Sequence, residues 1–347
     1  MDMTAQQRRP ISSVNPYLNA VTAILAEEAL RLADGIDSEP RQGALMGVLT
    51  GLPFTVKEGL DVQGSATTHG LAPLKPAIAH KDAAVVRALR ESGGIPLART
   101  NMPEFGMRWH TTNGLHGATK NPWNADITPG GSSGGEAVAI AAGMSPLGVG
   151  SDGAGSLRWP AQCCGIAALK PSHARLPADP AGPFPFAFQI LAAAGPMARH
   201  VDDLRLAFSV MCHGTAPADP WHVAAPLDGP AISKPIRVAV MTNPGDLGVH
   251  PDIAGAVTSA ARMLQDAGYA VEERDAPSLQ RVLEIYLQIM NRYSRPTAEP
   301  QRAPTGLVSA EFNAFWEKLL GPWEQAAGVP THDPMMERAA FSGSGLS

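Results

Sequence analysis

Apolar positions with helical spacing alternate with short apolar runs along the first half of the chain. The spacing predicts helices over residues 18–33, 83–90 and 135–142. The short runs predict a loop followed by a strand within 48–56, and strands over 95–98 and 146–150. Beyond residue 230, the pattern predicts strands over 236–241 and 269–273 and helices over 253–267, 279–292 and 309–325. Helices that alternate with short buried strands are typical of an α/β fold.

Composition and charge narrow the class of protein. The 347 residues are 44% hydrophobic and 17% charged, which fits a soluble chain with one large or two smaller domains. A net charge of −5 and the lack of a long basic run argue against nucleic acid as a partner. No window of about 18 apolar residues occurs, so we expect no membrane span.

The cysteines and histidines indicate neither a metal site nor a disulfide framework. Cys163, Cys164 and Cys212 lack zinc-ligand spacing, and the ten histidines form no close pair. We therefore expect no metal, and a reducing cytoplasm is the expected location.

The first segment with candidate chemistry is GGSSGGE at residues 130–136. Ser133 and Glu136 stand three residues apart directly before an apolar helix, as in a capping box. This assignment leaves Ser132 without a capping role. A phosphate-binding loop is the other general interpretation, but the Lys–Ser/Thr pair that ends such a loop is absent.

Two further segments carry candidate groups. In GAGSLR, residues 153–158, small residues precede Ser156 and let backbone amides approach a ligand, as an oxyanion hole requires. Taken alone, a strand-to-helix turn with a capping serine explains this segment better. Lys57 follows an apolar run in GLPFTVKE, and burial there would lower its pKa towards that of a useful base. Taken alone, a lysine that snorkels at a strand end or pairs with Glu58 is the simpler explanation.

The predicted elements bring the two serine segments together. The helix over 135–143 runs about 14 Å at 1.5 Å per residue, and the strand over 146–150 returns about 16 Å at 3.3 Å per residue. Ser132 and Ser156 are therefore expected to lie close together, although 24 positions separate them. Two serines near small-residue amides suggest nucleophilic catalysis, with Lys57 as the candidate base because neither segment contains a histidine.

In combination, these segments resemble the amidase signature family. The matching text includes GLPFTVKEGLDVQG, NMPEFGM, GATKNPWN and TPGGSSGGEAVAIAAGMSPLGVGSDGAGSLRWPAQCCGIAALKPS. The resemblance implies a mixed central β-sheet covered by helices. It also implies a Ser–cisSer–Lys triad of Ser156 as nucleophile, Ser132 as bridging residue after a cis peptide, and Lys57 as base. The amides implied to hold the oxyanion are those of Gly153, Ala154, Gly155 and Ser156.

The activity implied by this resemblance is hydrolysis of a linear amide. An acyl-enzyme on Ser156 would yield a carboxylic acid and ammonia or an amine, without a cofactor. A small-molecule amide is the implied partner, and the sequence is also compatible with a homodimer.

Two features depart from the family pattern. Ala154 stands where the family usually has glycine, which requires a negative φ at that position. Family members also normally continue well beyond the length of this chain, so we expect a fold shortened at its C-terminus. Residues 1–230 would form the amidase signature core with its N-terminal helix, and residues 231–347 a truncated C-terminal part of the same domain.

Two other functions stay open beside an active amidase. One is a catalytically impaired amidase remnant, suggested by the expected truncation. The other is a glutamine-hydrolysing amidotransferase subunit. The stretch LAAAGP at residues 191–196 lacks the Asp–Gln type of sequence that usually precedes Gly–Pro in that subclass, which makes the amidotransferase the weaker alternative.

Overall fold

The computed structural model describes most of the first 275 residues and a few positions beyond them. The described residues are 3–38, 47–178, 190–217, 219–232, 234–244, 248–275, 281–282, 284–286, 308–311, 314 and 318. The chain forms two compact units, one of Met1–Ala225 with Pro296–Ser347 and one of Pro226–Arg295. The division at residue 230 into two parts of one domain stays a prediction.

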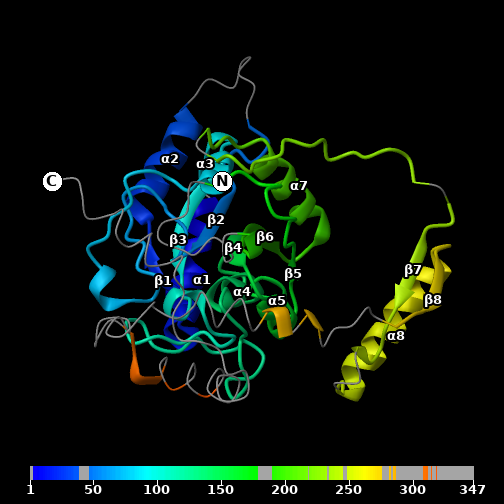
Figure 1. Cartoon of the computed structure of the whole chain (residues 1–347). Coiled ribbons are helices and arrows are strands. Elements are labelled where there is room, and N and C mark those ends of the chain that lie inside the picture. The colour runs from blue at the N-terminus through cyan, green and yellow to red at the C-terminus, as the bar shows by residue number, and fades with distance from the viewer. Residues whose placement is uncertain are drawn as a thin grey trace, which may run out of the picture. The chain divides into compact units, whose positions relative to one another are not determined.

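A six-stranded sheet of mixed direction forms the centre of the larger unit, in the order β1-β3-β2-β4-β6-β5 (Figure 1). The strands are β1 (Val21–Ile24), β2 (Pro53–Lys57), β3 (Ile95–Thr100), β4 (Leu147–Asp152), β5 (Ala167–Ala168) and β6 (Ala193–Ala198). β2 runs parallel to β3 and β4, whereas the pairs β1–β3, β4–β6 and β5–β6 are antiparallel. The predicted α/β fold with a mixed central sheet is confirmed.

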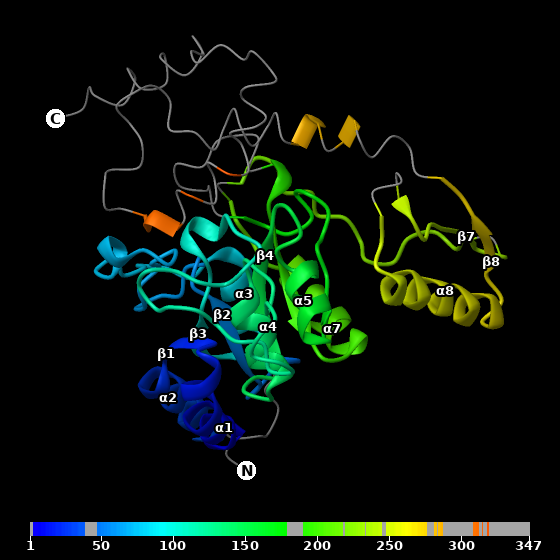
Figure 2. The ribbon, with the colours of Figure 1, turned by 90° about the horizontal axis from the view of Figure 1, so that it is seen from below.

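Helices cover the sheet (Figures 1 and 2). They are α1 (Met3–Leu18), α2 (Ala26–Ser38), α3 (Ala84–Glu91), α4 (Gly134–Ala141), α5 (Arg158–Cys164) and α7 (Val201–Cys212), with short 3-10 turns at Ala72–Leu74 and Glu104–Gly106. One apolar cluster joins α1, α2, α4 and α5 to the sheet, and a second joins α3 and α7 to it. Phe54 and Val56 of β2 enter the second cluster, so the pleat turns Thr55 and Lys57 towards the side of α4.

The helix predicted over residues 18–33 is wrong in its first half. α1 ends at Leu18, β1 follows, and α2 begins only at Ala26. Asn19 has a φ of 52°, which interrupts the helix, and its side-chain amide holds the chain to the carbonyl of His116 at 2.7 Å. Val21 and Ile24 then pair with β3, where branched side chains are favourable.

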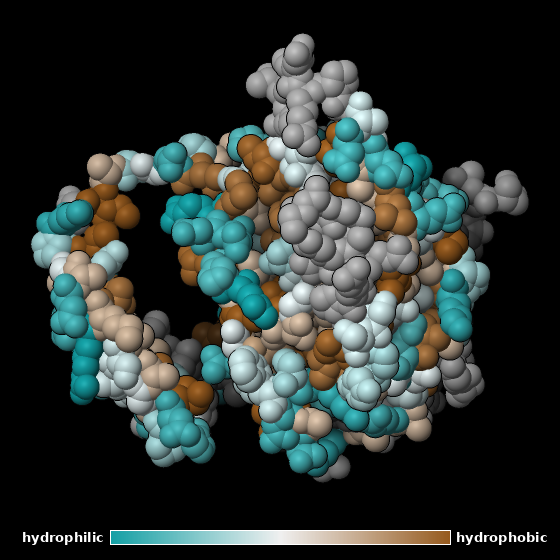
Figure 3. Space-filling view, turned by 180° about the vertical axis from the view of Figure 1, so that it is seen from behind, coloured by the Kyte–Doolittle hydropathy of each residue, from teal (hydrophilic) through white to brown (hydrophobic). Residues whose placement is uncertain are grey.

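The smaller unit contains a strand–helix–strand motif. β7 (Arg237–Val240) and β8 (Ala270–Glu273) are parallel and are connected through α8 (Pro251–Asp266), close to the elements predicted over 236–241, 253–267 and 269–273. The helices predicted over 279–292 and 309–325 lie mostly outside the described residues. Among the helices that the structure describes, none has the length and hydropathy to cross a membrane. Figure 3 shows polar and apolar residues interspersed over the visible face of the molecule.

Candidate active site

Lys57 is the last residue of β2, and its side chain is buried, with 1% of its surface exposed. Its Nζ lies in hydrogen-bond contact with Ser132 Oγ at 2.6 Å and with Ser151 Oγ at 3.0 Å. Burial lowers the pKa of Lys57 to about 7, while the nearby carboxylates of Asp152 and Glu136 act in the opposite direction. A large fraction of this amine is therefore neutral near pH 7 and able to accept a proton.

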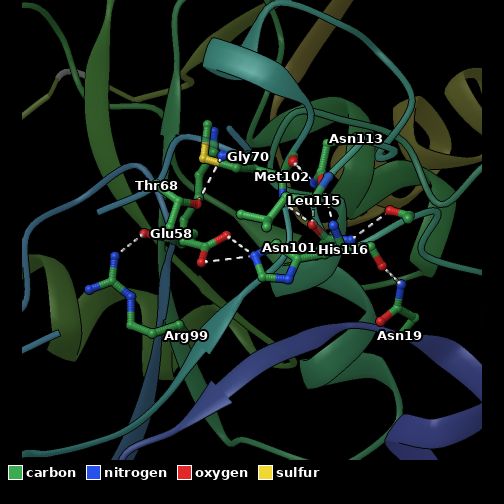
Figure 4. A network of polar contacts seen from close by, with 12 residues as sticks. Asn19, Glu58, Thr68, Gly70, Arg99, Asn101, Met102, Asn113, Leu115 and His116 are labelled. Atoms are coloured by element: carbon green, nitrogen blue, oxygen red, sulfur yellow. Dashed lines mark hydrogen bonds and ion pairs between the residues drawn. The ribbon is translucent and has the colours of Figure 1, made fainter. Parts of the chain in front are cut away.

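The residue after Lys57 does not pair with it. The Glu58 carboxylate lies against His116, with its two oxygens 3.2 and 3.1 Å from Nε2, as Figure 4 shows. The backbone amide of His116 in turn donates to Asn113 Oδ1 at 2.6 Å, and Asn113 Nδ2 donates to Asn101 Oδ1 at 2.7 Å. This network ties the 101–119 loop to the end of β2. The alternative of a Lys57–Glu58 ion pair is therefore wrong.

Ser132 lies at the entry to α4, after a cis peptide bond from Gly131. The glycine is required by close packing, since a Cβ at Gly131 would lie 2.8 Å from the Arg108 carbonyl oxygen and 2.9 Å from the His110 amide nitrogen. The backbone of the 108–110 loop thus backs directly onto the segment that presents Ser132 to Lys57.

The predicted capping box is wrong. Ser133 occupies the N-cap position of α4, but its hydroxyl makes no capping bond and instead contacts the backbone of Ser151 at 3.3 and 3.4 Å. Glu136 turns towards the sheet, where its carboxylate accepts from the hydroxyls of Thr55 and of Thr100, the latter at 2.6 Å. α4 packs directly on the sheet, so Glu136 is fully buried, and burial raises its pKa to about 7.

Ser156 is buried and lies beside the Ser132 segment. The amide of Ser133 donates to the Ser156 carbonyl oxygen at 3.1 Å, which joins the loop before α4 to the loop before α5. The expected approach of the two segments is confirmed. Lys57 and Ser132 are thus in contact at the end of β2, and the turn that carries Ser156 lies against the Ser132 segment.

Asp152, the last residue of β4, anchors the turn that leads to Ser156. Its carboxylate accepts from the amides of Gly155 at 2.7 Å and Leu157 at 3.1 Å, and from Arg158 Nε at 2.9 Å. Burial raises the pKa of Asp152, but these hydrogen bonds outweigh burial and hold the pKa below its ordinary value. Asp152 is therefore ionised and fixes the turn by charge-assisted hydrogen bonds. Neither Asp152 nor Ser151 was among the predicted site residues.

The turn presents backbone amides near Ser156. Because the Gly155 amide donates to Asp152, it is already engaged. Within the described part of the chain, the amides of Gly153, Ala154 and Ser156 have no acceptor. Ala154 is not among the described residues with positive φ, so its side chain is tolerated where glycine was expected. The arrangement can donate hydrogen bonds to a developing oxyanion from three of the four predicted positions.

The donor set offers no evident place for a metal ion. Among the residues that the structure describes, no three or more His, Cys, Asp or Glu side chains are grouped as metal ligands. The polar groups around Lys57 are mainly hydroxyls, a chemistry suited to proton transfer between neutral groups.

Comparison with known proteins finds relatives that match most of this chain. The chain is 42% identical over 328 residues to an indoleacetamide hydrolase of Bradyrhizobium diazoefficiens, covering 91% of this chain and 62% of that protein. It is 35% identical over 296 residues to one chain of the glutamyl-tRNA(Gln) amidotransferase of Rhodopirellula baltica, covering 83% of this chain and 58% of that protein.

A similar solved structure is that of a bacterial aryl acylamidase belonging to the amidase signature enzymes. It has a TM-score of 0.74 and 26% sequence identity, and the match covers 91% of this chain and 68% of that chain. The chain spans somewhat less than two thirds of the length of the indoleacetamide hydrolase and of the amidotransferase chain. Residues 2–312 match the Amidase family over most of the sequence, and the chain belongs to that family.

Proposed function

We propose that this chain carries the catalytic machinery of an amide hydrolase that acts through an acyl-enzyme on Ser156. The observation that carries the proposal is the 2.6 Å contact between Lys57 Nζ and Ser132 Oγ in a buried site beside the Ser156 turn. Burial of a lysine costs the folded state stability, so a buried lysine in contact with a serine hydroxyl favours a functional role.

In the proposed reaction, the neutral amine of Lys57 accepts the proton of the Ser132 hydroxyl, while Ser132 accepts the proton of the Ser156 hydroxyl. The Ser156 oxygen forms a bond to the amide carbonyl carbon, and the carbonyl π electrons move to oxygen. When the tetrahedral intermediate collapses, the C–N bond breaks and the leaving nitrogen takes the proton back through the same relay. Water then attacks the ester by the reverse route and releases the carboxylic acid.

Two features of the site support the individual steps. A lysine with a pKa of about 7 is close to the value that serves a general base at neutral pH. The amides of Gly153, Ala154 and Ser156, which have no acceptor among the described residues, would hold the oxyanion, and each such donor is typically worth about 3 kcal/mol in the transition state.

Arylacetamides are the substrates to test first, because the relative at 42% identity is named as an indoleacetamide hydrolase. The test is ammonia release from indole-3-acetamide and from a panel of simple primary amides, with the Ser156→Ala and Lys57→Ala variants alongside. The proposal expects turnover that both substitutions reduce by more than a thousandfold. Normal turnover in Ser156→Ala would contradict it.

A second candidate is glutamine hydrolysis in an amidotransferase, favoured by the relative at 35% identity. Glutamine belongs in the same panel, with and without partner subunits. Glutamine turnover that rises with partner subunits would support this candidate. A folded chain that turns over no amide would instead support the catalytically impaired remnant. A homodimer and a cytoplasmic location stay predictions.

A further inference from the structure

Two tryptophans connect the oxyanion turn to the loop behind Ser132. Trp109 Nε1–H donates to the Ala154 carbonyl oxygen at 3.1 Å, and Trp159 Nε1–H donates to the Trp109 carbonyl oxygen at 3.0 Å. The Trp159 backbone amide then donates to the Gly155 carbonyl oxygen at 2.7 Å. We call these two residues and their three hydrogen bonds the tryptophan brace.

The brace fixes the orientation of the peptide unit between Ala154 and Gly155. In a planar trans peptide the carbonyl and the amide point in opposite directions. Here the Ala154 carbonyl is held by Trp109, while the Gly155 amide is held by Asp152 Oδ1 at 2.7 Å. A peptide with a partner at each end cannot rotate about its chain axis without breaking a hydrogen bond. The next peptide unit, which carries the Ser156 amide, is held at its Gly155 carbonyl oxygen by the Trp159 amide at 2.7 Å. The brace thus fixes the two successive peptide units that lead to Ser156.

The same brace joins the two halves of the site. The 108–110 loop that carries Trp109 backs onto Gly131, where a Cβ would meet the backbone of Arg108 at 2.8 Å. One side of this loop thus supports the segment of Ser132, and the indole of Trp109 reaches the turn before Ser156. A shift of the loop would alter both.

We propose that Trp109 is a positioning residue for the proposed hydrolysis, holding the oxyanion turn through its indole N–H, and that Trp159 acts through Trp109. This inference rests on the proposed function. Both residues are 41% exposed, so burial alone gives a limited reason for tryptophan at these positions. The N–H groups are the part of each side chain that reaches the turn or its supporting loop.

The test compares variants that keep an aromatic ring and remove the N–H, with the smaller ring of phenylalanine matched in the control. Trp109→Phe is expected to lower kcat about tenfold with KM within twofold, because the oxyanion donors remain but lose their fixed direction. Trp159→Phe should lower kcat in the same way by a smaller factor. Trp123→Phe is the matched control, since Trp123 Nε1–H also donates to a backbone carbonyl, that of Cys164 at 2.8 Å, away from the turn. Its kcat should equal that of the parent.

A fluorophosphonate probe gives a second readout that needs no substrate. Its P=O oxygen requires the same donors, so the second-order rate of labelling at Ser156 should also fall about tenfold in Trp109→Phe. A labelled parent with an equal rate in Trp109→Phe would overturn the brace and leave the hydrolase proposal intact. An equal loss in Trp123→Phe, or a loss confined to KM, would also overturn the brace. An unlabelled parent would overturn both proposals.

Folding of each variant is checked by circular dichroism and thermal melting. If Trp109→Phe does not fold, Trp159→Phe decides the question, since it removes the next hydrogen bond of the brace and leaves the Trp109 indole with its N–H in place. A folded Trp159→Phe variant with parental kcat and labelling rate would then overturn the inference.

Discussion

Replacing Lys57 with methionine is expected to abolish hydrolysis and to stabilise the fold at pH 7. The pKa of this amine falls from an ordinary value of 10.5 to about 7 on burial. At about 1.4 kcal/mol per pKa unit, the difference corresponds to about 5 kcal/mol against the charged form. Between about pH 7 and pH 10 the unfolded chain binds a proton that the folded chain does not. The lysine therefore costs the folded state stability at pH 7, and this cost declines as the pH rises towards 10.

Hydrogen bonds reduce the expected gain. Lys57 Nζ contacts the hydroxyls of Ser132 and Ser151, and the loss of each contact costs about 1 kcal/mol. Subtracting about 2 from about 5 leaves a net gain of about 3 kcal/mol in the free energy of unfolding at pH 7. At pH 10 the folded lysine is neutral and the unfolded lysine, with a pKa of 10.5, has begun to lose its proton, so most of the cost has gone. The lost hydrogen bonds then balance or exceed what is left of it, and the gain should vanish or change sign.

The assay is urea denaturation of the parent and Lys57→Met at pH 7 and pH 10, followed by circular dichroism, with amide turnover measured in parallel. Lys120→Met is the control, because Lys120 is exposed and its removal should change neither stability nor turnover. A Lys57→Met variant less stable than the parent by the same amount at both pH values would refute the account of Lys57 as a buried, largely neutral amine.

Three further predictions concern the same site. The value of kcat/KM should rise about tenfold per pH unit below pH 7 and level off above it, because Lys57 must be neutral; a pH profile that is flat from 5 to 7 would be inconsistent with this role. Asp152→Asn should lower kcat more than tenfold and lower the melting temperature, because an amide cannot accept from Gly155, Leu157 and Arg158 together; steady-state kinetics and calorimetry measure both effects. Gly135→Ala should cost at least about 2 kcal/mol, since its Cβ would lie 2.4 Å from the Asn101 amide nitrogen. Gly35→Ala, with nothing within 4 Å of its Cβ, should not destabilise the chain in the same urea titration.

The periodic elements around the site follow from local sequence. The apolar spacing before residue 98 and after residue 135 places α3, β3, α4 and β4 within a few residues of their observed bounds. The lengths of α4 and β4 are also enough to predict that the Ser132 and Ser156 segments meet, which the contact between the Ser133 amide and the Ser156 carbonyl confirms.

Tertiary partners were harder to predict. The capping-box pattern at Ser133 and Glu136 is a local signal, but α4 lies flat on the sheet and directs the carboxylate to two threonines on separate strands. β1 was hidden because its short apolar run continues the helical spacing on either side. The tryptophan brace joins residues 50 positions apart, one in a loop and one in the first turn of α5, and no sequence periodicity indicates their contact.

The most direct test of the central claim is intact-mass analysis after treatment with a fluorophosphonate probe, with Ser156→Ala and Lys57→Met alongside. The probe forms a bond from the Ser156 oxygen to phosphorus and releases fluoride, so it reports an activated serine without a known substrate. The account predicts one adduct in the parent, none in Ser156→Ala, and a rate at least a thousandfold lower in Lys57→Met. A folded parent that takes no adduct, or an adduct that persists in Ser156→Ala, would contradict the proposed role of Ser156.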